Sequence, residues 1–241
     1  MCGIVGFVGR AQAAPILLDG LRRLEYRGYD SAGIAVEQAG EIRIVKTKGR
    51  IQCLADLTGE GEKVPGTCGI GHTRWATHGE PSDANAHPHR SMSGKIAVVH
   101  NGIIENYVEL REYLQKKGYV FVSDTDTEVV AHLIDYYYKG DLLKAMIKAV
   151  NRLEGSYALG VVCADCPDQF AAVRKASPLI VGLSEEGNFI ASDVTALISH
   201  TKRVMYLEDD EIVLVGREGV RVYNMNEEEI EKEVSEVTWN I

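Results

Sequence analysis

The chain opens with Met1-Cys2-Gly3-Ile4-Val5-Gly6-Phe7-Val8, in which a cysteine directly follows the initiator methionine and runs into an apolar segment. Residues 4–8 have the length and the apolar character of a short buried strand. Removal of Met1 would leave a thiol and a free α-amine together on residue 2. These opening residues therefore predict a buried first strand that carries a chemically unusual residue at its start.

Beyond this strand, apolar residues recur at helical spacing in segments that begin near Pro15, Ile103, Thr125 and Leu142. Proline is well tolerated in the first turn of a helix. Thr125 and Glu128, three residues apart, match the pattern of a capping box. Four helices are therefore expected, in the ranges 15–24, 103–117, 125–134 and 142–153.

Short β-rich runs occupy most of the remaining chain, and many follow one another without an intervening helix. Such grouping differs from the strict alternation of strands and helices in a doubly wound parallel sheet. It indicates an α+β fold in which antiparallel sheets pack against helices. No linker divides the chain, so residues 1–241 are expected to form a single domain. The predicted strands are 4–8, 34–36, 42–45, 96–99, 157–163, 170–174, 179–183, 189–192, 204–207, 212–215 and 220–223.

Charge and cysteine content restrict the function classes. The formal net charge of −9 argues against nucleic acid or an anionic membrane as the main partner. Five cysteines without a regular framework do not resemble a secreted disulfide scaffold. The start lacks the features of a signal peptide, and no apolar run approaches the roughly 18 residues of a membrane span. A cytoplasmic location is therefore expected.

Cys2 is the first candidate for chemistry. An α-amine has a pKa of about 7.7–8.0, so part of it is neutral near pH 7 and can act as a base toward a thiol whose pKa is about 8.5. The alternative is a small buried residue that happens to follow Met1. Position alone leaves both interpretations open.

Residues 72–81, His-Thr-Arg-Trp-Ala-Thr-His-Gly-Glu-Pro, follow a short apolar segment and are expected at the end of a strand and in the loop after it. Arg74 suits a carboxylate because its guanidinium can donate two parallel hydrogen bonds. Trp75 suits an apolar lid beside a reacting centre. A surface arginine and a half-buried tryptophan are the alternatives.

Four histidines invite a metal hypothesis, which their spacing does not support, because it matches neither a zinc-protease helix nor a zinc finger. These histidines are His72, His78, His87 and His89. The pair Cys163 and Cys166 stands alone, and no phosphate-binding loop is present. We therefore expect neither a metal nor another cofactor.

Asn101-Gly102 follows the predicted strand 96–99 and permits two interpretations. A tight hairpin turn is the commonest meaning of this dipeptide. A side-chain amide beside a glycine N–H at a strand-to-helix turn is instead a plausible oxyanion hole. Further along, Asp126 lies in an acidic stretch that caps a helix and can also present a carboxylate to an ammonium group.

Taken together, several long stretches of the chain resemble the N-terminal-nucleophile glutamine amidotransferases, and in particular the glutaminase half of the glutamine–fructose-6-phosphate aminotransferases. The resemblance covers essentially the whole chain. The stretches that carry it are Cys2–Gly6, Arg23–Gly33, His72–Pro81, Asn85–His89, His100–Asn106, Ser123–Glu128, Ser177–Leu179 and Phe189–Asp193.

The resemblance implies a four-layer αββα sandwich and a role for each central residue. Cys2 would attack the side-chain amide of glutamine, with its own α-amine as base. Asn101 and the N–H of Gly102 would hold the oxyanion. Arg74 would bind the α-carboxylate of the substrate, and Asp126 its α-ammonium group.

Four further residues receive roles from the same resemblance. Thr77 and His78 would line the pocket within a mobile loop. Trp75 would gate the passage of ammonia. Arg27 lies in a family motif near the nucleophile and is included among the catalytic residues.

The resemblance also implies partners. L-glutamine would be the substrate, and a sugar-isomerase domain, in cis or as a separate chain, would use the ammonia to form glucosamine 6-phosphate. Nothing in this chain resembles a sugar-phosphate site, and any oligomer is expected to form through that other domain. Three alternatives remain, namely the glutaminase of another amidotransferase such as amidophosphoribosyltransferase or asparagine synthetase, a catalytically silent interaction domain, and a small thiol-metal protein.

Overall fold

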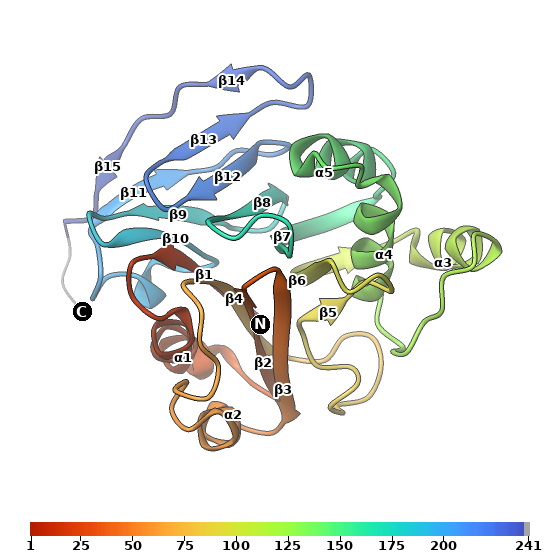
Figure 1. Cartoon of the computed structure of the whole chain (residues 1–241), viewed down its shortest axis with the longest axis horizontal. Helices are drawn as coiled ribbons and strands as arrows, with labels where there is room; N and C mark the ends of the chain where they lie inside the picture. Colours follow the sequence, from red (N-terminus) through yellow and green to blue (C-terminus); the bar gives the residue numbers. More distant parts are fainter. Residues whose placement is uncertain (239–241) are drawn as a thin grey trace.

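Two antiparallel sheets lie face to face, and helices cover the outer face of each sheet (Figure 1). This arrangement comes from a computed structural model, which describes residues 1–238. The layers therefore follow the order αββα, as the sequence resemblance implies. Within the described residues, no helix has the length and apolar character needed to cross a membrane.

The first sheet contains the predicted opening strand in its interior, between two other strands. Within the described residues it has eight antiparallel strands. In spatial order they are β15 (Ser235–Glu236), β11 (Arg203–Tyr206), β9 (Ile180–Leu183), β10 (Gly187–Ala191), β1 (Gly3–Gly9), β4 (Cys68–Arg74), β2 (Ser31–Gln38) and β3 (Glu41–Lys48).

The second sheet has seven antiparallel strands within the same residues and is built mainly from the C-terminal half of the chain. In spatial order they are β14 (Glu229–Ile230), β13 (Val220–Tyr223), β12 (Ile212–Gly216), β8 (Gln169–Lys175), β7 (Gly155–Cys163), β6 (Ile96–Ile104) and β5 (His89–Arg90).

The helices divide between the two outer faces. Among residues 1–238, two α-helices cover the first sheet and three cover the second. The helices on the first sheet are α1 (Ala13–Leu24) and α2 (Ile51–Thr58). Those on the second sheet are α3 (Tyr107–Lys116), α4 (Thr127–Tyr137) and α5 (Leu142–Val150). Two short 3-10 helices are also present in the described residues, η1 (Glu25–Arg27) and η2 (Val194–Ala196).

Strand β1 shows why the opening segment is apolar throughout. Ile4 and Val8 pack between the two sheets, whereas Val5 and Phe7 pack against the helices of the outer layer. Successive side chains of a strand point to opposite faces, so a strand buried on both faces needs apolar residues at every position. The four-layer fold supplies two buried faces and thus accounts for the continuous apolar run.

The sequence prediction was wrong for the segment around residue 103. Strand β6 continues through Ile104, and the next helix begins only at Tyr107. Asn101 and Gly102 therefore lie inside a strand that pairs with β7, neither in a hairpin turn nor at a strand-to-helix turn. Ile103, the first residue of the predicted helical spacing, is a strand residue.

Helix α2 was missed. It has only eight residues and ends at Thr58, and the following Gly59 adopts a left-handed conformation with φ of 57°. The buried residues Ile51, Leu54 and Ala55 recur at helical spacing. That spacing, followed by a C-terminal glycine, is the signal that could have revealed it.

The predicted capping box at Thr125 is only half present. The N–H of Glu128 donates to Oγ1 of Thr125 (3.3 Å), but the Glu128 carboxylate reaches further back. It accepts hydrogen bonds from the N–H of Val122 (2.9 Å), from the N–H and hydroxyl of Ser123 (2.7 and 2.6 Å) and from His132 Nε2 (3.1 Å). Glu128 thus fastens the whole turn that precedes α4.

Burial by itself would raise the pKa of Glu128, but the hydrogen bonds from His132, Ser123 and Val122 hold it below its ordinary value. A carboxylate whose pKa is lower in the folded state stabilises the fold above its unfolded pKa, about 4.3 for Glu. That contribution is lost as the pH falls through the lower, folded pKa.

We expect Glu128→Gln to lower the free energy of unfolding by about 2–4 kcal/mol at pH 7, because an amide cannot accept from all four donors. Denaturant titration at several pH values measures both effects. The variant should also lose part of the wild-type decline in stability at acid pH. Glu112→Gln, at an exposed position of α3, serves as the matched control. Equal stability of the two variants would contradict this account of the turn.

Candidate active site

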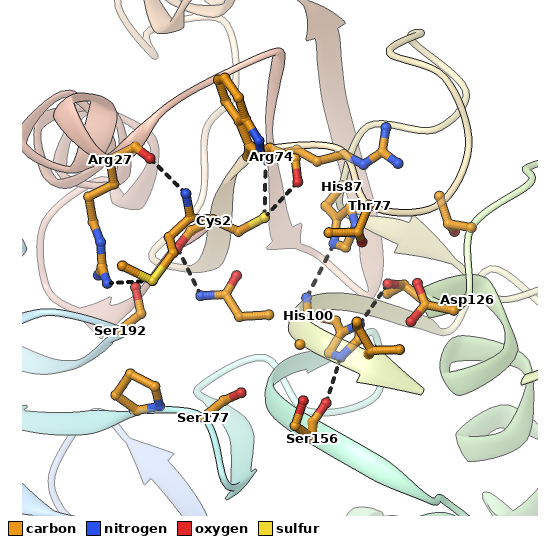
Figure 2. A pocket seen from close by; sticks show the side chains of 18 residues that line it. Cys2, Arg27, Arg74, Thr77, His87, His100, Asp126, Ser156, Ser177 and Ser192 are labelled. Atoms are coloured by element: carbon orange, nitrogen blue, oxygen red, sulfur yellow. Dashed lines mark hydrogen bonds between the residues drawn. The ribbon is translucent and has the colours of Figure 1, made fainter. Parts of the chain in front are cut away.

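A cavity of about 390 Å³ lies where the start of β1, the end of β4 and the strand β6 come together (Figure 2). Both sheets therefore contribute to its wall. Eight of the nine residues that the sequence nominated line it, and His78 is the exception. The full lining consists of Met1, Cys2, Arg27, Arg74, Trp75, Thr77, His87, His100, Asn101, Gly102, Ile103, Thr125, Asp126, Thr127, Ser156, Ser177, Pro178 and Ser192.

The thiol of Cys2 is held by the main chain of one residue, Trp75. It donates to the main-chain oxygen of Trp75 (3.4 Å) and accepts from the N–H of the same residue (3.2 Å). Burial raises the pKa of Cys2, although the Trp75 N–H, the N-terminal ammonium and Arg74 act in the opposite direction. The sulfur is therefore positioned but retains its proton at neutral pH, and it needs a base to become a nucleophile.

Asn101 lies across from Cys2 on the facing sheet. Its Nδ2 donates to the main-chain oxygen of Cys2 (3.1 Å). The next residue, Gly102, has φ of +117°, and a Cβ at this position would lie 2.2 Å from the main-chain oxygen of Ser156. Only glycine fits there. A side-chain amide and a glycine peptide thus lie together in the wall of the cavity that Cys2 also lines.

Arg74 and Asp126 place opposite charges on the cavity wall, and both side chains are almost fully buried. Nη2 of Arg74 donates to the main-chain oxygens of His78 and Gly79, whereas its Nη1 has no hydrogen-bond partner among the described residues. Oδ2 of Asp126 accepts from the N–H of Ile104 (2.8 Å). A buried guanidinium nitrogen without a partner is costly, and a ligand carboxylate would satisfy it.

Trp75 lies at the mouth of the cavity, where 55% of the residue is exposed. Its ring packs over Gly28, at which a Cβ would lie 2.6 Å from a ring carbon. His78 lies outside the cavity wall and makes an edge contact with the ring of Tyr107, with the centroids 5.3 Å apart. Thr77 therefore lines the cavity, whereas His78 contributes only its main-chain oxygen, which accepts a hydrogen bond from Arg74.

The N-terminal residue occupies part of the same cavity. The ammonium group of Met1 donates to the main-chain oxygen of Arg27 (2.7 Å), and Nη2 of Arg27 contacts the Met1 sulfur at 3.7 Å. Nη1 of Arg27 also lies 3.5 Å from Asp193 Oδ2. Arg27 therefore holds the start of the chain rather than the thiol itself.

Four buried histidines, His72, His87, His89 and His100, lie close together, and two of them, His87 and His100, line the cavity. The sequence connected His72, His87 and His89 only with a metal hypothesis. His72 stacks on His87 with ring centroids 4.0 Å apart, and His87 makes an edge contact with His89 at 4.8 Å. Burial lowers the pKa of each of these three and of His100, so all four stay neutral near pH 7. No group of three or more His, Cys, Asp or Glu side chains among residues 1–238 is arranged to hold a metal ion.

Sequence reasoning assigned no role to several polar residues of the wall, including Ser156, Ser177 and Ser192. The hydroxyl of Ser192 accepts from the N–H of Ile4 (2.9 Å) and so fixes the start of β1. Ser177 and Ser192 both fall within stretches that carry the family resemblance. Their position as polar residues at the ends of apolar strands is the sequence signal that could have identified them as cavity residues.

Comparison with known proteins agrees with this geometry. Residues 72–199 match the family described as the glutamine amidotransferase domain. The chain is 59% identical, over its whole length, to the glutamine–fructose-6-phosphate aminotransferase (isomerizing) of Clostridium tetani, and 51% identical to that of Thermus thermophilus. It covers 39% and 40% of these two proteins, respectively, so it spans about two fifths of their length.

Solved structures show the same fold. The glutamine phosphoribosylpyrophosphate amidotransferase of B. subtilis superimposes with a TM-score of 0.81 at 28% identity, over 93% of this chain and 49% of that one. A glutamine aminotransferase class-II domain protein from Silicibacter pomeroyi, at 16% identity, has a TM-score of 0.64 over 93% of this chain and 99% of that one. With the family match, the identity along the whole chain and the paired sheets in agreement, the chain belongs to the glutamine amidotransferase family.

Proposed function

We propose that this domain hydrolyses L-glutamine to glutamate and ammonia, with Cys2 as the nucleophile once Met1 has been removed. The observation that carries the proposal is the convergence, in one cavity, of the Cys2 thiol, the Asn101 amide and two buried side chains of opposite charge. Each of these groups matches one part of a glutamine molecule.

The charges fit the amino-acid end of the substrate. The free Nη1 of Arg74 would receive the α-carboxylate, and the carboxylate of Asp126 would receive the α-ammonium group. Both side chains are buried, so each interaction would be stronger than the same contact at the surface. Thr77, on the loop that Arg74 holds through its main chain, would close over the ligand, with His78 beside it.

The reaction would proceed through a thioester. The α-amine of Cys2 takes the thiol proton, and the sulfur attacks the side-chain carbonyl carbon of glutamine. Asn101 Nδ2 and the Gly102 N–H stabilise the oxyanion of the tetrahedral intermediate. Its collapse breaks the C–N bond, and the amine returns the proton to the departing nitrogen as ammonia. Water then hydrolyses the thioester, releases glutamate and restores the thiol.

The role of the α-amine follows from the pKa of the thiol. Burial raises the pKa of Cys2, so a thiolate does not form spontaneously at neutral pH. An α-amine with a pKa of about 8 is neutral often enough to act as the base. While Met1 remains, that nitrogen is part of a peptide bond and cannot accept a proton. Excision of Met1 would therefore both create the base and clear its own side chain from the cavity.

For the whole protein, we propose that the ammonia converts fructose 6-phosphate to glucosamine 6-phosphate in a sugar-isomerase domain, in cis or on a separate chain. The 59% identity to a glutamine–fructose-6-phosphate aminotransferase supports this over a phosphoribosylpyrophosphate amidotransferase, for which the identity is 28%. Trp75, exposed at the cavity mouth, would gate the passage of ammonia. Oligomerisation through the isomerase domain and a cytoplasmic location remain predictions from the sequence.

Cys2→Ala should abolish glutamine hydrolysis, with a loss of roughly 10⁴-fold or more, because no other group in the cavity can form the thioester. Stability should change by no more than about 1 kcal/mol, since only two weak sulfur contacts are lost. Glutamate release and thermal unfolding measure the two effects. Cys53→Ala, at an exposed cysteine, is the matched control and should keep full activity.

Intact mass before and after exposure to a glutamine-like diazoketone completes this test. The Met1-free protein should gain one adduct, which maps to Cys2. A folded, Met1-free protein that neither turns over glutamine nor becomes labelled would contradict the proposal and favour a silent interaction domain.

Arg74→Lys should raise KM for glutamine by roughly 10- to 100-fold, because lysine keeps the charge but cannot hold the loop and a carboxylate at the same time. Steady-state kinetics with glutamine and with glutaminamide, which lacks the α-carboxylate, measure the effect. The difference between variant and wild type should shrink for glutaminamide. Arg43→Lys, at an exposed position of β3, is the control. An unchanged KM would remove Arg74 from the carboxylate site.

A further inference from the structure

His72 contacts Asn101, whose amide donates to the main-chain oxygen of Cys2. It belongs to β4 of the first sheet, is fully buried, and reaches across to β6 of the second sheet. Its Nε2 lies 2.9 Å from the main-chain oxygen of His100 and 3.0 Å from Oδ1 of Asn101. It does not line the cavity, so it cannot touch a substrate there.

The protonation of the imidazole follows from these contacts. A main-chain carbonyl can only accept a hydrogen bond, so Nε2 of His72 must carry a hydrogen in order to bond to His100. Nδ1 of His72 is buried and has no partner among the described residues. Burial lowers the pKa of His72 to about 3, so the ring holds a single proton, and that proton is on Nε2.

The orientation of the Asn101 amide is fixed by the contact that its nitrogen makes with Cys2. Its Nδ2 donates to the main-chain oxygen of Cys2, another group that can only accept. Rotation of the amide by 180° would set the Asn101 oxygen against the Cys2 oxygen and the Asn101 NH₂ group against the Nε2–H of His72. The contact with His72 and the contact with Cys2 therefore both require the same orientation of the Asn101 amide.

The imidazole ring is itself fixed in place. It stacks on His87, and Nδ1 of His87 accepts from the main-chain N–H of His100 (3.2 Å). The main-chain N–H of His100 is thus held by His87, and its main-chain oxygen is held by His72. The strand that carries Asn101 cannot shift without breaking these contacts.

We infer that His72 is a positioning residue, which donates from Nε2 to Oδ1 of Asn101 and so keeps the Asn101 NH₂ group directed toward Cys2, where the oxyanion would form. This inference rests on the proposed function, because Asn101 is an oxyanion donor only if the domain hydrolyses an amide. Loss of one such donor lowers kcat by roughly 10²–10³-fold, and misorientation of a donor that is still present should cost less.

The test is a double-mutant cycle. His72→Asn, whose shorter amide does not reach Asn101, should lower kcat by roughly 10- to 100-fold and change KM by less than about threefold. In an Asn101→Ala background the same substitution should lower kcat by less than about threefold, because its target is gone. His72→Gln, whose amide nitrogen falls near the position of Nε2, should restore at least about a third of the wild-type kcat.

An unchanged kcat in a folded His72→Asn protein, or a loss of the same size in both backgrounds, would overturn the inference. A purely structural role would give the second result and would move KM as well. Thermal unfolding of each variant shows that the comparison is made on folded protein.

Histidine-selective ¹⁵N NMR of the wild-type chain provides a measurement that does not depend on the activity of any His72 variant. The His72 signal is assigned by its absence from whichever of His72→Gln and His72→Asn is folded. A neutral ring with its proton on Nε2 supports the inference, and a proton on Nδ1 overturns it. Failure of the proposed function is distinguishable, because then the Met1-free wild type itself would release no glutamate from glutamine.

Discussion

The hydrogen bond from the Asn101 amide to the main chain of Cys2 joins the two sheets at the place where the chemistry is proposed. Cys2 precedes the interior strand β1 of one sheet, and Asn101 lies in β6 of the other. The face-to-face packing of the sheets therefore sets the distance between thiol and amide. Rigid elements define such distances better than loops do.

Burial determines the electrostatics of the site. It raises the pKa of the Cys2 thiol and keeps the neighbouring histidines neutral. A thiol that stays protonated is protected from oxidation but inactive until a base is present. The same low-polarity surroundings strengthen the interactions that Arg74 and Asp126 would make with a charged substrate. Under the proposed function, the base would therefore become available only when Met1 is removed.

The buried polar side chains also explain how a partly exposed turn can hold a residue of the cavity wall. Asp126 follows a turn that has no regular structure of its own. The Glu128 carboxylate fastens that turn through Val122 and Ser123, and Thr125 contacts His89 Nε2 at 3.1 Å. These contacts connect the turn to the core beneath it. Fully satisfied polar networks of this kind specify one conformation rather than several.

By itself, the sequence determined the α+β class, the antiparallel sheets and, through its resemblance to one family, the four layers and the nominated site residues. Apolar periodicity predicts the strands and helices because each of them must bury a defined face. It could not separate the end of β6 from the start of α3, since the apolar residues after Asn101 fit both patterns. It also missed α2, which is too short for its periodicity to stand out.

Only the tertiary structure decided how residues distant in the sequence meet. The stacking of His72 on His87, the orientation of the Asn101 amide and the position of His78 outside the cavity all depend on the packing of one sheet on the other. Hydrogen bonds between side chains that are far apart in the chain leave no local pattern, because either partner alone looks like an ordinary buried polar residue. The sequence could therefore nominate the reacting groups, whereas the packing determined which neighbours orient them.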